Sequence, residues 1–428
     1  MSALLRFVLL GLVRVFYPDR AVGRAAPTPD QGPILVVANH PNGLIDPLLV
    51  CLALGRPVAF LAKSTLWQNP FFRRCMDAFG ALPVTRAHEG DTRLNDRTFA
   101  SCRTLLVDGG WLALFPEGKS HDETTLQPLK TGAARIALGA VAEGATTLRV
   151  LPVGLLYADK GVFRSAVAVA IGAPVAVQPA PPDDRDAVTA LTERITEALA
   201  DVVLQADNQA LWRAFLAVAA WTGAPDLAAR EARARRLAAG WRALVATDPA
   251  EADTIAAEVR RFARLLGTVG VADPFAIEAS RPTSVLAQTL PLVLLAPVAL
   301  VGAVLAWLPY RAIRPIALHL ARGHADIVGT IKLLLGVVVL TPVYVGWAVA
   351  AGAVGGTAAG AGMLVIGPLT GLAALTFDEQ LTLRREALRG ISLRLFEPRH
   401  ALVIAARRAE LVARVDAALG SGARSGPP

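Results

Sequence analysis

The sequence predicts an α/β protein with a largely buried sheet flanked by helices, followed by a helical subdomain and C-terminal membrane-embedded helices. Three observations support this fold class. Short Val- and Leu-rich runs bounded by Gly and Pro alternate with helix-sized intervals from Pro33 to about Pro174. The next hundred residues lack strand-like alternation, and the last third contains two long stretches without a charged residue. A chain of 428 residues is long enough for two or three such modules.

The first 22 residues are predicted to form an interfacial helix. Leu4 to Tyr17 are apolar but interrupted by Arg6 and Arg14, which makes the run too short for the ~20 residues of a bilayer span. No small-residue cleavage site follows it. The alternative is a core helix of the first domain.

Residues 23–182 are predicted to form the α/β domain. Its expected strands lie in the runs ILVVANH, RPVAFLAK, WLALFPEG, LRVLPVGLLY and AVAVAIGAPV. PAPPDDRDAV then ends the pattern, and its aspartates are suited to capping a helix. Residues 183–280, rich in Ala, Arg and Glu, are therefore assigned to a helical subdomain.

Residues 281–380 are predicted to be membrane-embedded helices. The uncharged stretch between Lys332 and Asp378 is long enough for two helices, and we expect a hairpin hinged around the glycines of 352–360. The stretch after Arg281 either spans once with a kink at its prolines or turns back in the bilayer. Basic residues flank both stretches, and the positive-inside tendency places all three flanks on one side, the cytoplasmic one. This favours two re-entrant or hairpin insertions over an odd number of crossings. Residues 381–428 are predicted to form a basic helical tail. The alternative is a buried helix pair in a soluble protein.

Composition narrows the classes of partner. Hydrophobic residues make up 54% of the chain and charged residues 18%, so disorder is excluded and contact with lipid is expected. A net charge of +8 suits anionic membranes, phosphorylated molecules or nucleic acids. No nucleic acid partner is expected, because the basic residues are scattered and no binding motif is present. Three cysteines without a C-x-x-C pair, and six histidines without ligand spacing, indicate neither disulfides nor a metal.

The most informative segment runs from Ile34 to Val50. A strand ends at Asn39 and His40, a Pro-Asn-Gly turn follows, and Asp46 opens the next apolar run. A neutral imidazole can take a proton from a hydroxyl, and a carboxylate can orient it and stabilise the resulting cation. We therefore predict His40 and Asp46 as catalytic. The alternative is that both residues only cap a turn.

A second segment places Glu117 and Gly118 at another strand end, where α/β proteins commonly bind ligands. Gly118-Lys119-Ser120 is not a nucleotide P-loop, since Ala113 stands where that motif requires glycine. No G-x-S-x-G elbow occurs, so a serine nucleophile has no support.

Arg86 ends a third segment, FGALPVTR, and its guanidinium suits a phosphate group. Pro152, in RVLPVGLLY, is expected to shape a pocket. Lys130 and Arg164 could add positive charge near the site, although a solvated surface position is the favoured interpretation for each.

Taken in order, NHPNGLID, GALPVTR, FPEGKSHDE and LPVGLLY resemble the four motifs of the glycerolipid acyltransferase family. The resemblance covers about Pro33 to Val175. It implies an acyl-CoA or acyl carrier protein co-substrate, no other cofactor and no metal. It also implies His40 as general base with Asp46 as its partner. The resemblance further implies that Arg86, Glu117, Gly118 and Pro152 bind the substrate. We add their neighbours Asn39 and Lys119 to this set.

One departure indicates a subgroup. Five residues separate His40 from Asp46, where most family members have four. With the GKSHDE extension and a later FRS segment, this is similar to the fungal glycerol-3-phosphate and dihydroxyacetone-phosphate acyltransferases. We therefore expect acylation of the sn-1 hydroxyl of glycerol 3-phosphate in phospholipid biosynthesis, at a membrane. The alternatives are a 1-acylglycerol-3-phosphate acyltransferase, a non-catalytic membrane scaffold, and a transporter with a cytosolic domain.

Overall fold

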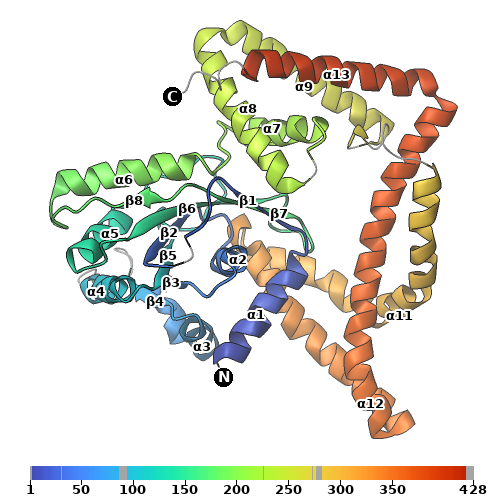
Figure 1. Cartoon of the computed structure of the whole chain (residues 1–428). Coiled ribbons are helices and arrows are strands. Elements are labelled where there is room, and N and C mark those ends of the chain that lie inside the picture. Colours follow the sequence, from blue (N-terminus) through green and yellow to red (C-terminus); the bar gives the residue numbers. More distant parts are fainter. Residues whose placement is uncertain are drawn as a thin grey trace. The chain divides into compact units, whose positions relative to one another are not determined.

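The computed structural model describes residues 2–29, 31–85, 94–224, 226–271, 273–275 and 282–420 (Figure 1). The chain divides into two compact units. Unit 1 comprises Met1–Arg213, Pro225–Arg235 and His324–Thr330, and unit 2 comprises Ala214–Ala224, Arg236–Gly323 and Ile331–Pro428. The sheet and the predicted catalytic residues belong to unit 1.

The sheet of unit 1 has eight strands, ordered β1-β7-β6-β2-β5-β3-β4, with β8 paired to β6. The strands are β1 (Arg20–Arg24), β2 (Ile34–Ala38), β3 (Ala59–Lys63), β4 (Leu82–Val84), β5 (Trp111–Leu114), β6 (Arg149–Tyr157), β7 (Val167–Ile171) and β8 (Val175–Ala176). Strands β6, β2, β5, β3 and β4 are parallel, so their carboxyl ends share one edge. Strands β7 and β8 run antiparallel to β6.

Helices cover both faces of this sheet (Figure 1). One face carries α4 (Leu94–Val107), α5 (Gly132–Ala142) and α6 (Arg185–Ala200), and the other carries α1 (Ser2–Phe16), α2 (Ile45–Leu54) and α3 (Pro70–Ala78), with the 3₁₀ turn η1 (Ser64–Gln68) before α3. Side chains alternate along a strand, so Leu35 and Val37 of β2 join the core formed with α4, α5 and α6. All five residues of β2 are buried, as the continuous apolar run predicted.

The amino-terminal helix is shorter than predicted. Helix α1 ends at Phe16, and residues from Arg20 form β1, although 1–22 was assigned to a helix. Pro18 cannot continue a helix and disfavours helical backbone in the residue before it. Strand β1 pairs with β7, and its residues are half-buried or exposed. Its sequence, RAVGR, therefore contains no apolar run from which a strand could have been predicted.

In its described residues, the regular structure of unit 2 is entirely helical, as the sequence predicted for the carboxyl-terminal part. The first residues of α7, α8 and α12 belong to unit 1. The helices are α7 (Gln209–Trp221), α8 (Leu227–Thr247), α9 (Pro249–Val269), α11 (Pro282–Ala321), α12 (Ala325–Phe396) and α13 (Pro398–Gly420). Trp221 packs edge-on against Phe262, with ring centroids 4.9 Å apart. Arg414 of α13 pairs with two glutamates of α9, Glu251 and Glu258.

Among the described residues, two helices, α11 and α12, are long and apolar enough to cross a membrane. Helix α11 is continuous for 40 residues despite four internal prolines. The first stretch is therefore a single helix and not the re-entrant or hairpin insertion that the flanking charges favoured. Many of their apolar side chains are exposed, including Val304 at 73%, Leu308 at 72% and Val354 at 94%. Such surfaces are suited to a lipid environment rather than to water.

The predicted hinge in α12 is present. Gly356 has φ 79° and ψ 176°, which interrupts the helical backbone. The segments on either side pack against each other, since a Cβ on Gly360 would lie 3.3 Å from the Cα of Gly352. Tyr344 likewise approaches Gly371, so this part of the chain is a helical hairpin. Small residues permit such close packing of apolar helices.

Candidate active site

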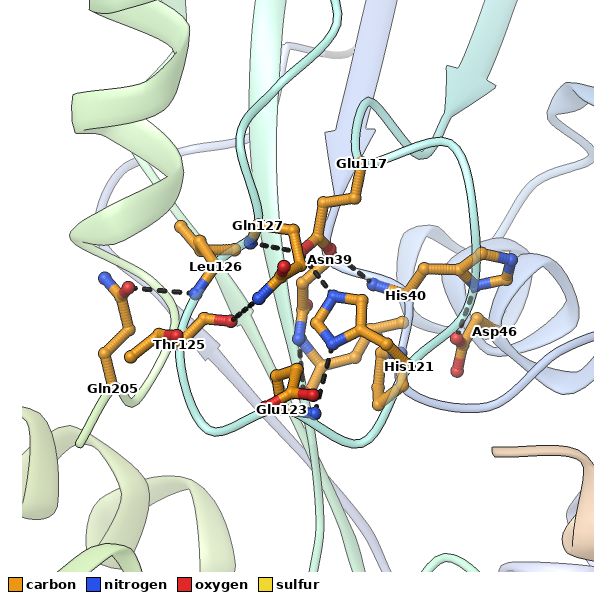
Figure 2. A network of polar contacts seen from close by, with 12 residues as sticks. Asn39, His40, Asp46, Glu117, His121, Glu123, Thr125, Leu126, Gln127 and Gln205 are labelled. Carbon is orange, nitrogen blue, oxygen red and sulfur yellow. Dashed lines mark hydrogen bonds and ion pairs between the residues drawn. The ribbon is translucent and has the colours of Figure 1, made fainter. Parts of the chain in front are cut away.

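His40 and Asp46 form a hydrogen-bonded pair at the carboxyl end of β2 (Figure 2). His40 follows the strand by two residues, and Asp46 lies in the first turn of α2. The His40 Nδ1 atom is 2.8 Å from Oδ2 of Asp46. A carboxylate only accepts, so Nδ1 carries the proton and Nε2 is left with a lone pair that can accept another. The turn with five intervening residues therefore brings the two side chains together.

Asp46 is fully buried and receives two further hydrogen bonds. The backbone N–H of Asn42 donates to Oδ2 at 2.7 Å, and the Tyr157 hydroxyl donates to Oδ1. Burial, and secondly the charge of Asp46, raise the pKa of the Tyr157 phenol well above its usual value. Tyr157 thus keeps its proton and remains a donor to Asp46. Three donors thus fix the orientation of this carboxylate.

The face of the His40 imidazole ring is held by an aromatic contact. It stacks on Phe115, with centroids 4.1 Å apart and planes inclined by 17°. Its side chain is 15% exposed, so the imidazole lies at the boundary between the protein and the solvent. This arrangement defines the direction in which Nε2 can take a proton.

Glu117 has a different environment from the one predicted. Its side chain is completely buried, and both oxygens are occupied by protein donors. Oε1 accepts from the His40 N–H at 3.1 Å, and Oε2 accepts from the Gln127 N–H at 2.8 Å. The Nε2 atom of His121 lies 2.5 Å from the same Oε2 (Figure 2). In this structure Glu117 joins its own loop to the backbone of His40 and does not present an oxygen to an acceptor molecule.

His121 belongs to the same network. The Glu123 N–H lies 3.2 Å from its Nδ1. Because Nδ1 accepts this bond, Nε2 carries the proton that is donated to Glu117. His121 and Glu117 thus form a second carboxylate-imidazole contact, and this contact fixes the loop that follows β5.

The other predicted substrate-binding residues are placed as follows. Asn39 is buried, and its amide makes two hydrogen bonds with the backbone of Leu155 in β6, so it joins β2 to β6. Gly118 has φ +77°, a backbone conformation that favours glycine, and a Cβ there would lie 2.5 Å from Nζ of Lys130, whose flexible side chain would have to move. Lys119 is exposed. Arg86 lies outside the described residues.

Pro152 is an internal residue of β6, paired with Val37 of β2. It lines a cavity of about 700 Å³ whose walls also include residues of β7, α6 and α8. His40, Asp46 and Glu117 do not line this cavity. Pro152 therefore shapes a cavity separate from the dyad.

Several residues of the site were not found by sequence reasoning. Tyr157, Asn42 and Phe115 contact the dyad directly, and each lies inside or beside a motif that was recognised. Lys160 donates to the carbonyl oxygens of Pro41 at 2.9 Å and His121 at 3.4 Å, and so ties the two loops together. Only proximity to the motifs could have indicated them, since none has a characteristic spacing.

Within the described part of the chain, no group of three or more His, Cys, Asp or Glu side chains could hold a metal ion. That the reaction requires no metal remains a prediction from the sequence. The carboxylate-oriented imidazole provides the chemistry that can be derived from the described residues.

An α/β domain with such an imidazole at a strand end defines an enzyme that can activate a hydroxyl by general-base catalysis. Residues 20–156 match the acyltransferase family model. Over these residues the chain therefore contains an acyltransferase domain.

Three relatives illustrate the similarity. An uncharacterized acyltransferase of Schizosaccharomyces pombe is 25% identical over 299 residues, covering 47% of this chain and 44% of the relative. Glycerol-3-phosphate O-acyltransferase 2 of Saccharomyces cerevisiae is 37% identical over 120 residues, covering 27% and 16%. A 1-acyl-sn-glycerol-3-phosphate acyltransferase of Chlamydomonas reinhardtii is 29% identical over 141 residues, covering 33% and 39%. The chain thus spans less than half the length of each.

Among solved structures, the 1-acyl-sn-glycerophosphate acyltransferase PlsC of Thermotoga maritima matches with a TM-score of 0.32 and 21% identity. The match covers 45% of this chain and 81% of that chain.

Proposed function

We propose that this protein is a membrane-bound acyltransferase that moves a fatty acyl group from acyl-CoA or acyl carrier protein to the sn-1 hydroxyl of glycerol 3-phosphate. The observation that carries the proposal is the 2.8 Å contact between His40 Nδ1 and Asp46, which leaves Nε2 as a base at the strand end. The match to a yeast protein named glycerol-3-phosphate O-acyltransferase supports the choice of acceptor.

The proposed reaction uses the dyad as a general base. Nε2 of His40 takes the proton of the acceptor hydroxyl as its oxygen attacks the thioester carbonyl, and Asp46 stabilises the imidazolium. When the tetrahedral intermediate collapses, the C–S bond breaks, the new C–O ester bond remains, and the thiolate leaves with the proton from His40. The products are lysophosphatidic acid and the free thiol.

The phosphate of the acceptor requires a cation in this proposal. Arg86 is our candidate, and exposed Lys119 could add charge from the loop after β5. We propose no metal or further cofactor. The apolar helices α11 and α12 hold the protein in a membrane, and we place the catalytic domain on its cytoplasmic face. Its partners are then membrane lipids, the acyl donor and the glycerol-phosphate acceptor, without nucleic acid.

A second candidate acceptor is 1-acylglycerol 3-phosphate, because one relative is named for that substrate. The same dyad could deprotonate its sn-2 hydroxyl, and the product would be phosphatidic acid.

An acceptor assay tests the proposal. The protein, purified in detergent, is incubated with palmitoyl-CoA or palmitoyl acyl carrier protein and with glycerol 3-phosphate, dihydroxyacetone phosphate or 1-acylglycerol 3-phosphate. Thiol release and lipid products are measured, with His40→Ala as the blank. We expect lysophosphatidic acid from glycerol 3-phosphate. Product from 1-acylglycerol 3-phosphate alone would support the second candidate, and no product from any acceptor would support a scaffold.

A further inference from the structure

The amino end of α12 belongs to unit 1, although the rest of this helix belongs to unit 2. Within unit 1, His324–Thr330 contact the loops that carry the dyad. The hydroxyl of Ser120 donates to Oδ2 of Asp326 at 2.5 Å, so the loop after β5 is bound to the first turn of α12. Thr330 and Asp326 also lie close to Gly43. A Cβ built on Gly43 would lie 3.3 Å from Oγ1 of Thr330.

Gly329 makes the closest approach. A Cβ at this position would lie 2.6 Å from the carbonyl oxygen of Lys160 and 3.0 Å from both polar atoms of the Asn42 side chain. The contact on one side is backbone, which cannot move away as a flexible side chain could. A glycine at position 329 fits between α12 and the catalytic loop, whereas the Cβ of any larger residue would force the backbone to shift.

The groups that Gly329 touches are those that orient the dyad. Asn42 is fully buried, and its backbone N–H donates to Asp46 at 2.7 Å. Its side-chain amide donates to the Tyr17 hydroxyl at 2.9 Å, which in turn donates to the Lys160 carbonyl at 2.8 Å. A displacement of Asn42 would thus change the hydrogen bonds of Asp46, and through Asp46 the direction of the His40 ring.

We infer that the first two turns of α12 hold the catalytic loop in its active arrangement, and that Gly329 is a positioning residue for His40. This inference rests on the proposed function, because it concerns the same dyad. Helix α12 continues from these turns into an apolar span, so the segment that would enter a membrane is continuous with the turns that contact the catalytic loop. The membrane helix then acts on turnover as well as on anchoring.

The test compares two glycines of the same helix. We expect Gly329→Ala to lower kcat at least tenfold, with the KM of both substrates within twofold, since misplacing a catalytic group by ~1 Å can cost ~100-fold. Gly336→Ala is the matched control, because nothing lies within 4 Å of a Cβ there. Both changes favour helix formation, so thermal unfolding in detergent is expected to show a folded protein. Wild-type kcat in Gly329→Ala would overturn the inference.

A second pair of variants covers the case in which Gly329→Ala does not fold. Asp326→Asn keeps an acceptor for Ser120, whereas Asp326→Ala removes it. We expect kcat to fall in Asp326→Ala and to fall less in Asp326→Asn. Equal values for these two variants and the wild type would contradict a positioning role.

A cross-linking measurement separates this inference from the proposed function. Ser120→Cys/Asp326→Cys should be joined by a short bis-methanethiosulfonate reagent, as detected by mass spectrometry of the digested protein, whereas Ser120→Cys/Gly336→Cys should not. If the wild type is inactive but Ser120→Cys/Asp326→Cys is cross-linked, the proposed function fails and the contact of α12 with the loop still stands. An active wild type in which the first pair does not cross-link would overturn the inference about α12.

Discussion

The change Glu117→Gln distinguishes two roles for this residue. The family resemblance assigns Glu117 to acceptor binding, whereas its three protein donors indicate that it positions His40. Glutamine has nearly the shape of glutamate but only one acceptor oxygen. If that oxygen faces His121 and the Gln127 N–H, the new NH₂ group faces the backbone N–H of His40, and two donors oppose each other.

The expected magnitude follows from these contacts. Leaving the buried His40 N–H without an acceptor costs about 1–3 kcal/mol. Because the lost bond is the one that holds His40, we expect kcat to fall about 5- to 150-fold, at ~1.4 kcal/mol for each factor of ten. The two remaining bonds change from charge-assisted to neutral, which lowers the free energy of unfolding further.

Steady-state kinetics with varied acceptor, together with unfolding in detergent, measures both effects. Glu123→Gln is the matched control, since Glu123 is exposed and only its backbone N–H contacts His121. A positioning role gives a lower kcat with an unchanged acceptor KM. A raised acceptor KM with wild-type kcat and wild-type stability would refute our reasoning and restore the acceptor-binding role.

Three further predictions concern the dyad and its surroundings. His40→Ala should lower turnover by at least ~10²-fold and leave the thermal unfolding curve unchanged, and an active variant would remove His40 from the mechanism. Arg86→Ala should raise the acceptor KM through loss of charge-assisted bonds to phosphate, so a defect confined to the acyl donor would contradict it. Burial, and then the charge of Asp46, raise the pKa of Tyr157, so above pH ~10 the unfolded chain loses this proton first. The free energy of unfolding should then fall by ~1.4 kcal/mol per pH unit as pH rises, and Tyr157→Phe should have a shallower slope in chemical denaturation above pH ~10.

Local patterns made much of the fold predictable. A continuous apolar run such as ILVVA predicts a buried strand because every side chain of a central parallel strand meets a covering helix. The hinge at Gly356 was indicated by its glycines within an uncharged stretch. The pairing of His40 with Asp46 was accessible because one short turn joins them. Edge strand β1 was missed because it carries no apolar run.

The roles of the surrounding residues depend on contacts between distant parts of the chain. Tyr157 donates to Asp46 across 111 positions, and Ser120 reaches Asp326 across 206. No spacing rule encodes such pairs, since they arise from the order of strands in the sheet and from the docking of α12. The sequence by itself determined the fold class, the acyltransferase resemblance and the pairing of His40 with Asp46, because each depends on short-range patterns. Only the tertiary structure decided that Glu117 is enclosed by protein donors and that Gly329 lies against Asn42 and the Lys160 carbonyl, because burial and close approach are properties of packing.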